Sequence, residues 1–353
     1  MQSFIYKSAP TRVIFGSGTV SQLAAEMELL SVRRALFLST PEQAGDAEAI
    51  AATVGDRDIG IYSNATMHTP VEVTDDAMTT VTACNADVVV AIGGGSTIGL
   101  SKAIALRTDL PQIVLPTSYA GSEMTAIIGQ TEGGRKTTQT TPRVQPEVVI
   151  YDVDLTMSLP PAMAGTSGIN AIAHAVEALY AQDRNPVISL MAEEAVRALA
   201  EALPRIVADP GAVDPRGGAL YGAWLCGMCL GSTGAALHHK ICHVLGGSFG
   251  MPHAETHTVM LPHVTAYNAP AAPEAMASLS RALGSPDPAR ALFDLAGAVG
   301  ARRSLRELGL TLDAAVEAGR LTFENAYWNP RPLDAEALES MMRRAWAGEP
   351  PKP

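Results

Sequence analysis

Residues 88–97 are VVVAIGGGST, an apolar β-branched run followed at once by three glycines. The run predicts a buried strand, and the residues after the glycines predict a helix. Glycines at such a strand-to-helix turn let the backbone approach a ligand closely, and the first turn of the helix offers unpaired N–H groups to a phosphate. Gly93, Gly94, Gly95 and Ser96 therefore indicate a phosphate or nucleotide site. Their spacing differs from the usual dinucleotide fingerprint, and a simple tight turn is the alternative.

Similar short β-branched runs on both sides of this segment alternate with helical patterns. Helical stretches at 19–30 and 75–84 separate some of these runs, which predict strands at 12–15, 35–39, 59–62, 88–92, 113–116 and 148–151. Repetition of strand, helix and strand predicts a mostly parallel, Rossmann-like sheet. Gly133 and Gly134, within the polar stretch 130–137, predict a hairpin inserted before the last strand.

The pattern of the sequence changes after Asp154. Strand patterns end there, and from Ser158 onward Ala, Leu, Met and Glu recur at helical spacing, as at 187–202 and 217–230. The chain is therefore predicted to have an α/β nucleotide-binding domain over residues 1–155 and an all-helical domain over residues 156–353.

The composition excludes several classes of protein. Hydrophobic residues make up 47% of the 353 residues and charged residues 17%, which suits a large core and argues against disorder. The net charge of -11, without a basic run, makes the chain a poor binder of nucleic acid or anionic membranes, so we expect neither partner. We also expect no membrane span, because no run of about 20 apolar residues occurs. Residues 1–10 lack the apolar segment of a signal peptide.

Four cysteines are present, and their use favours a reducing compartment, so we expect a cytoplasmic protein. Cys226 and Cys229 form a Cys-x-x-Cys pair, a spacing also found in zinc and redox sites. They lie in an apolar stretch and no second cysteine pair accompanies them. We therefore interpret them as packing residues of a buried helix.

A second candidate cofactor segment follows the predicted strand at 113–116. Residues 115–125 are LPTSYAGSEMT, and Thr117, Ser118 and Ser122 place hydroxyl groups just beyond the carboxyl end of that strand. Cofactors of open α/β sheets bind at this edge. Lys136 is a further candidate, for pairing with a cofactor phosphate or ribose, with a solvated hairpin lysine as the alternative.

Histidines are concentrated in one part of the second half. Five of the eight lie between His238 and His257. His239 and His243 are four residues apart, so they share one face of a helix, and His253 follows a glycine-rich turn. Histidines clustered in this way are typical of a divalent-metal site.

Asn170 and His174 are also four residues apart, on a predicted helix at 168–180. A lone histidine is usually structural, but the density of histidines downstream favours one site shared with His174. We interpret His238 and His263 as structural or surface residues.

Three segments taken together resemble the group III, iron-containing alcohol dehydrogenase family. They are GGGS at 93–96, PTSYAGSE at 116–123, and the spacing His239-x3-His243-x9-His253. The likeness covers almost the whole chain. It implies an N-terminal α/β nucleotide domain, a C-terminal helical domain and an active site in the cleft between them. By motif position it also implies His243 as a histidine beside the site, and metal-ligand positions at Asn170, His174, His239 and His253.

Two departures from the family pattern bear on the metal. Asn170 stands where the family has an aspartate, and residues 97–99 are TIG where it has Pro-x-Asp. With HHKICHVLGG at 238–247 and MHTP at 67–70, these departures resemble one branch of the family. Members of that branch reduce the C=C bond of 2-maleylacetate to 3-oxoadipate in the breakdown of resorcinol-type and chlorinated aromatics. The resemblance implies NADH or NADPH as cofactor and a homodimer.

The chemistry of that branch fits the residues. Hydride delivered to the far carbon of a double bond conjugated to a ketone leaves an enolate, which needs hydrogen-bond donors and then a proton. Histidines can supply both, whereas direct ketone reduction makes an alkoxide for which a metal ion is more useful. We therefore expect no bound metal, and we assign catalysis to His174, His239, His243 and His253, with His243 as the proton donor.

The substrate of that branch is a dianion, which needs cationic or hydrogen-bonding partners. Lys240, His243 and His257 are the nearby candidates, with Asn170 beside them. Arg331 is a weaker candidate, for which a helix-terminus partner is the alternative. Two other activities stay open. One is a metal-dependent alcohol dehydrogenase in which Asn170 binds iron or zinc weakly, and the other is a lyase or synthase that uses its nicotinamide only transiently.

The second predicted strand bears on cofactor choice. It ends in Leu38-Ser39-Thr40-Pro41, with no acidic residue before Glu42. An acid at that strand end binds the ribose 2′-hydroxyl and repels a 2′-phosphate. With Ser39 as the candidate contact instead, we expect NADPH as well as NADH to be used.

Overall fold

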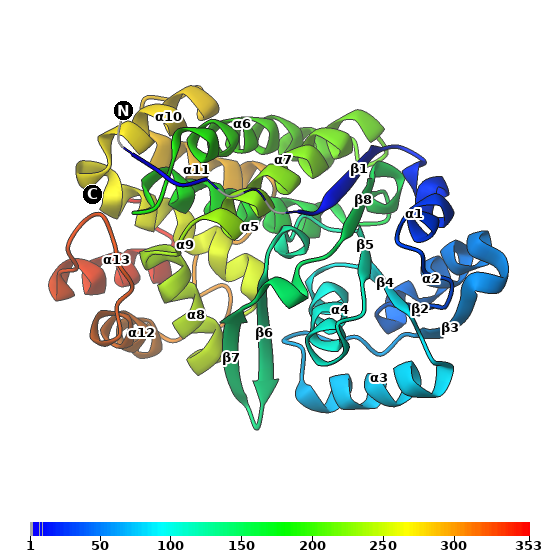
Figure 1. Ribbon diagram of the computed structural model, residues 1–353. Helices are drawn as coiled ribbons and strands as arrows, with labels where there is room; N and C mark the ends of the chain where they lie inside the picture. Colours follow the sequence, from blue (N-terminus) through cyan, green and yellow to red (C-terminus); the bar gives the residue numbers. More distant parts are fainter. Residues whose placement is uncertain (1–2, 7, 9) are drawn as a thin grey trace. The chain divides into compact units, whose positions relative to one another are not determined.

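The computed structural model describes residues 3–6, 8 and 10–353, which form two compact units (Figure 1). The α/β unit comprises Ser8–Leu159. The helical unit comprises Pro160–Pro353 together with the described residues 3–6. The division after Leu159 lies close to the predicted domain boundary at residue 155.

All six predicted strands of the parallel sheet form. They run in the order β1-β8-β5-β4-β2-β3, and every pairing is parallel. Their bounds are β1 (Arg12–Gly16), β2 (Ala35–Leu38), β3 (Asp58–Tyr62), β4 (Val88–Gly93), β5 (Gln112–Pro116) and β8 (Val148–Asp152). The predicted hairpin is β6 (Ile127–Glu132) and β7 (Arg135–Thr140), and it turns at Gly133 and Gly134, whose φ angles of 55° and 77° are left-handed.

Helices cover both faces of this sheet. They are α1 (Leu23–Leu29), α2 (Ala44–Ala51), α3 (Val71–Cys84) and α4 (Gly95–Thr108), joined by 3-10 turns at Thr19–Gln22, Pro41–Gln43, Ala52–Arg57, Ser122–Met124, Pro142–Val144 and Val153–Thr156. Side chains alternate along each strand. In β2, Phe37 therefore packs with α1 and α2, whereas Leu36 and Leu38 pack with α3 and α4. Burial of both faces explains why the strands are continuous apolar runs.

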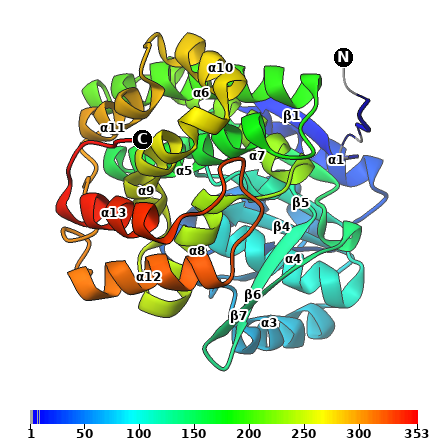
Figure 2. The same ribbon diagram turned by 90° about the vertical axis from the view of Figure 1, so that its left-hand side faces the viewer.

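The second unit is all-helical in its described residues, as predicted (Figure 2). Its helices are α5 (Pro161–Tyr180), α6 (Pro186–Ala208), α7 (Val213–Ser232), α8 (Leu237–Phe249), α9 (His253–Asn268), α10 (Pro273–Leu283), α11 (Pro288–Ala298), α12 (Leu312–Glu324) and α13 (Ala335–Ala347), with a 3-10 turn at Ala269–Ala271. In the described chain no single helix is long and apolar enough to cross a membrane. The pair α7 and α8, bent by 95°, meets that test together by length and composition only.

Helices α5, α8 and α9 carry the histidines. The C-terminal half of α5 is buried on all sides, from Gly168 to Tyr180. Helix α8 ends at Gly250, which has a left-handed φ of 65° and donates its N–H to carbonyls of the last turn. Pro252 then forms the N-cap of α9, so the glycine-rich turn places His253 at the first position of that helix. Cys226 and Cys229 are buried inside α7, as predicted.

Candidate active site

Six histidine rings come together in the helical unit. His174 comes from α5, His238, His239 and His243 from α8, and His253 and His257 from α9. The centroid of the His257 ring lies 4.4 Å from that of His253, 4.8 Å from His238 and 5.2 Å from His239. The structure thus gathers the predicted histidines and includes His238, which the sequence indicated only as a structural or surface residue.

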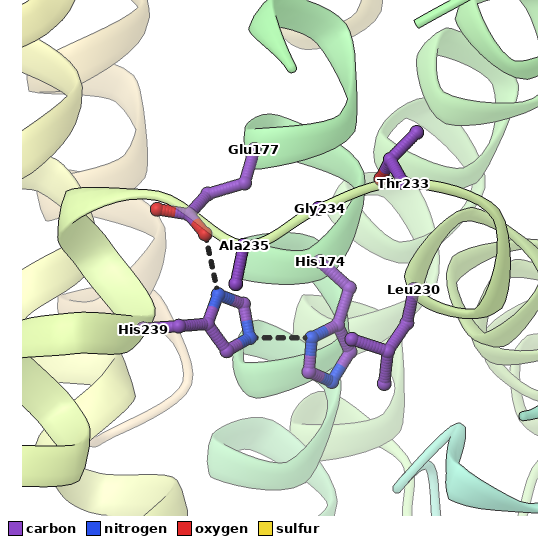
Figure 3. A pocket seen from close by; sticks show the side chains of 7 residues that line it. All are labelled: His174, Glu177, Leu230, Thr233, Gly234, Ala235 and His239. Atoms are coloured by element: carbon purple, nitrogen blue, oxygen red, sulfur yellow. Dashed lines mark hydrogen bonds and ion pairs between the residues drawn. The ribbon is translucent and has the colours of Figure 1, made fainter. Parts of the chain in front are cut away.

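His174 and His239 form the first hydrogen-bonded pair of this group (Figure 3). Nδ1 of His174 lies 2.8 Å from Nε2 of His239, and Nδ1 of His239 lies 2.7 Å from Oε2 of Glu177. The rings of the two histidines are stacked, with centroids 4.9 Å apart. Glu177 was not among the residues predicted for the site. Its position three residues after His174 places it on the same face of α5.

Glu177 also completes the N-terminus of α8. The N-cap residue is Ala236, whose side chain cannot accept a hydrogen bond. Glu177 accepts the backbone N–H of Ala236 and that of His238, both at 2.7 Å. One buried carboxylate from α5 therefore caps α8 and holds His239, and the positive end of the α8 dipole stabilises its charge.

His238 and His257 form a second pair. Nε2 of His238 lies 2.9 Å from Nδ1 of His257 and 3.8 Å from Sγ of Cys242. These three ligand atoms lie within 4.8 Å of one another, close enough to hold a metal ion. Burial lowers the pKa of both histidines well below their usual range and raises that of the Cys242 thiol. A buried, neutral His257 is a poor partner for a carboxylate, so its contact with substrate stays a prediction.

The exposed side of α8 and the start of α9 carry a third group. His243 and His253 are exposed, and Lys240 is half-buried. Nζ of Lys240 lies 5.1 Å from the centroid of the Tyr327 ring, and the Tyr327 hydroxyl lies 3.5 Å from Nδ1 of His243, a long contact. Tyr327 was missed by the sequence analysis because it lies in the irregular segment between α12 and α13, where no periodic pattern marks it.

Asn170 and Arg331 differ in what surrounds them. Asn170 lies on α5, and its buried Oδ1 has no hydrogen-bond partner among the described residues. Nη1 of Arg331 donates to the carbonyl of Tyr267 at 2.8 Å, and the guanidinium lies 4.3 Å from the Tyr267 ring centroid. Tyr267 is in the last turn of α9, so the structure gives Arg331 the contacts of a helix-terminus partner. Its contact with substrate stays a prediction.

The positions of the family's metal ligands fit a divalent ion poorly. Asn170, His174, His239 and His253 offer neutral donors only, and the nearby carboxylate of Glu177 is bonded to the far side of the His239 ring. Nitrogens bound to one zinc ion at 2.0–2.1 Å lie about 3.3 Å apart in tetrahedral geometry, whereas Nδ1 of His174 and Nε2 of His239 lie 2.8 Å apart and bond to each other. Only the unpartnered Oδ1 of Asn170 favours an ion.

In the α/β unit, the predicted cofactor segments meet beyond the carboxyl ends of β4 and β5. Gly93 has a φ of 152°, and a Cβ there would lie 2.4 Å from Thr97 Oγ1. A Cβ on Gly94 would lie 2.7 Å from Ser118 Oγ. The backbone N–H of Thr117 donates to the Gly93 carbonyl at 3.1 Å. Because α4 begins at Gly95, the unpaired N–H groups of its first turn, with Ser96, lie at this edge.

A buried lysine supports the same edge. Nζ of Lys102, on α4, donates to the carbonyls of Ser122, Thr125 and Ile127 at 2.5, 2.7 and 2.9 Å. Burial lowers its pKa to about 7, and Glu123 opposes the shift. Lys102 thereby connects α4, the helix after the glycine turn, to the segment that carries Ser122 by hydrogen bonds. The sequence did not predict this role.

Two predicted cofactor residues remain without a visible role. Ser39 is fully buried at the end of β2, and its hydroxyl has no partner within the part of the chain that the structure describes. The side chain of Lys136 lies outside the described residues. Gln43 was not predicted, and its Nε2 donates to Thr117 Oγ1 at 2.8 Å.

Comparisons with known proteins agree with both units. The profile of iron-containing alcohol dehydrogenase matches residues 10–153, and that of the Fe-containing alcohol dehydrogenase family, C-terminal, matches residues 164–346. The chain belongs to the iron-containing alcohol dehydrogenase family, a family of NAD(P)-dependent oxidoreductases.

Within that family the chain is similar to proteins named maleylacetate reductase. It is 55% identical over 348 residues to that of Sphingobium indicum, covering 99% of both chains. The crystal structure of maleylacetate reductase from Agrobacterium tumefaciens matches with a TM-score of 0.97 and 52% identity, over 99% of this chain and 100% of that one. The enzyme from Rhizobium sp. strain MTP-10005 matches with a TM-score of 0.96, again at 52% identity and with the same coverage.

The buried histidines predict an acid-sensitive fold. Burial lowers the pKa of His238 and His257 far below its usual range and that of His263 to about 4, so all three stay neutral in the folded chain. The unfolded chain takes up protons below its histidine pKa of about 6.5. The contribution of these three histidines to the free energy of unfolding is therefore complete above about pH 6.5 and decreases as the pH falls below it. From about pH 7.5 to about pH 5.5, each histidine should cost about 1 kcal/mol of unfolding free energy.

Urea unfolding followed by circular dichroism across this range measures the slope. Replacing His263 by Leu should reduce the slope by about one histidine's share. A slope that is the same in the wild type and in His263→Leu would show that His263 is protonated in the folded chain.

Proposed function

We propose that this chain is a maleylacetate reductase, which uses NADH or NADPH to reduce the C=C bond of 2-maleylacetate to 3-oxoadipate. One observation carries the proposal, namely the likeness over the full chain, at about half identity, to relatives named for that activity. The histidine group supports it, because its neutral donors suit an enolate better than an alkoxide on a metal ion.

The residues of the α/β unit hold the cofactor. Gly93 and Gly94 let the backbone approach the pyrophosphate, and the N–H groups at the start of α4 bind its oxygens. When bound, the reduced nicotinamide supplies a hydride to the double-bond carbon far from the ketone. No acidic residue follows β2 before Glu42, so a carboxylate does not repel a 2′-phosphate there. Both NADPH and NADH are therefore used.

The helical unit holds the substrate and supplies the proton. Lys240 binds a carboxylate of the dianion from the exposed side of α8, and His243 protonates the enolate carbon. The Tyr327 ring lies against Lys240, and its hydroxyl reaches Nδ1 of His243, so this tyrosine holds both side chains on one face. His174 and His239 donate hydrogen bonds or orient donors for the enolate oxygen.

The setting of the enzyme follows from the same proposal. All four cysteines are free thiols, which suits the reducing cytoplasm where aromatic breakdown takes place. The small dicarboxylate is its partner, neither nucleic acid nor membrane is required, and the chain acts as a homodimer.

The activity test is consumption of reduced cofactor. Purified protein given 2-maleylacetate should oxidise NADH, and also NADPH, and form one 3-oxoadipate for each cofactor oxidised. Propanediol and glycerol with NAD⁺ are the controls for an alcohol dehydrogenase, and they should give no comparable rate. Turnover of these alcohols without maleylacetate reduction, or product formation without net cofactor use, would replace the proposal by one of its two rivals.

Two substitutions on α8 separate proton supply from anion binding. His243→Ala should lower kcat by roughly a hundredfold, the scale expected for loss of a general acid. Lys240→Met should instead raise KM for maleylacetate, with kcat less affected and the free energy of unfolding changed by no more than about 0.5 kcal/mol. Steady-state kinetics of both variants provide the comparison. An active His243→Ala enzyme with an unaltered pH–rate profile would move proton donation to His253 or His174.

Metal independence is the remaining prediction. Dialysed protein should contain far less than one iron or zinc per chain and keep full activity in excess EDTA, because no carboxylate completes the ligand positions. Elemental analysis of the same sample covers the His238, Cys242 and His257 cluster as well. Activity lost to EDTA and restored by iron or zinc would contradict the prediction. Asn170→Asp should raise metal affinity if the mapped positions converge on one ion.

A further inference from the structure

We infer that Glu177 is a positioning residue that fixes the tautomer of His239 and, through it, the orientation of the His174 ring. The inference rests on the proposed function only for its effect on the rate. The positions of one ring proton on His239 and one on His174 do not depend on any substrate.

The placement follows from the donors around Glu177. A carboxylate has acceptor atoms only. Oε1 accepts the N–H of His238, and Oε2 accepts the N–H of Ala236 and faces Nδ1 of His239 at 2.7 Å (Figure 3). Each oxygen of this group already accepts one backbone N–H from the start of α8. Nδ1 of His239 must therefore carry the hydrogen of that bond.

The tautomer of His239 determines which nitrogen donates in the bond between His239 and His174. In the tautomer of His239 that has its hydrogen on Nδ1, Nε2 is an acceptor. Nδ1 of His174 lies 2.8 Å from that atom, so it is the donor of the second bond. The chain of donors thus runs from His174 through His239 to Glu177. The His239 ring cannot turn over without losing both hydrogen bonds, and the His174 ring cannot turn over without losing its bond to His239.

A structural role for Glu177 is the competing explanation, because the same carboxylate caps α8. The two roles involve different partners, which allows them to be separated. Ala236 is the N-cap and has an extended backbone with φ of -125° and ψ of -150°, a conformation in which a serine side chain can cap the helix itself. Ala236→Ser therefore supplies a local cap, but it gives His239 no carboxylate.

The first measurement is the tautomer of His239 in the unmodified protein. In nitrogen-15 spectra of histidine-labelled protein, with His239→Gln identifying the resonances, His239 should have its proton on Nδ1 without any substrate or cofactor. A proton on Nε2 would overturn the inference, whatever the activity of the enzyme. A failed maleylacetate assay leaves this result unaffected, so the two proposals fail separately.

The second measurement compares Glu177→Ala with the double variant Glu177→Ala/Ala236→Ser. Glu177→Ala should lose thermal stability and lower kcat by about tenfold or more, the scale for loss of a group that orients a site histidine, with the Kd for NADH unchanged. The double variant should recover stability but not kcat. Recovery of both would show that Glu177 serves only as a cap. Should Glu177→Ala fail to fold, the tautomer measurement and the double variant still decide the matter.

Discussion

The buried carboxylate of Glu177 is the contact on which the arrangement of the histidine group depends. A buried polar group without hydrogen-bond partners is costly, and this one has three nitrogen partners at 2.7 Å. Two belong to the backbone at the start of α8 and one to a side chain of that helix. The position of α8 against α5 must satisfy all three at once, which restricts both the approach and the rotation of the helix. Every histidine on α8 is placed as a consequence.

That constraint separates the histidines into different chemical settings within a short distance. His239 and His174 are aligned on a carboxylate, whereas His238 and His257 are buried against each other and kept neutral by desolvation. His243 lies on the exposed side of the same helix, beside Lys240 and Tyr327. His238 and His239, one position apart on α8, thus have different partners, because successive side chains on a helix point about 100° apart.

The α/β unit follows a simpler rule. The edge beyond the carboxyl ends of β4 and β5 consists of a turn that has no room for a side chain, at Gly93 and Gly94, and of the helix that begins immediately after it. Lys102 fixes the neighbouring segment through three carbonyls, so the edge is held from inside the unit. Backbone groups held in this way need little reorganisation when an anion binds.

The sequence by itself determined the features that depend on neighbouring residues. Alternating strands and helices, the Gly133–Gly134 hairpin, the glycine turn and the change to an all-helical unit all follow from periodicity and turn chemistry, and each forms where it was predicted. The motif spacing also predicted that His174, His239, His243 and His253 belong to one group. Only the tertiary structure decided their partners. His239 bonds to His174, 65 residues away, rather than to His243 on its own helix, and Arg331 lies on the end of α9. The contacts of Glu177 and Tyr327 with the histidines were identified only from the fold. Periodicity specifies which face of a helix is buried, but the rotation and approach that choose a partner are set by packing against distant segments.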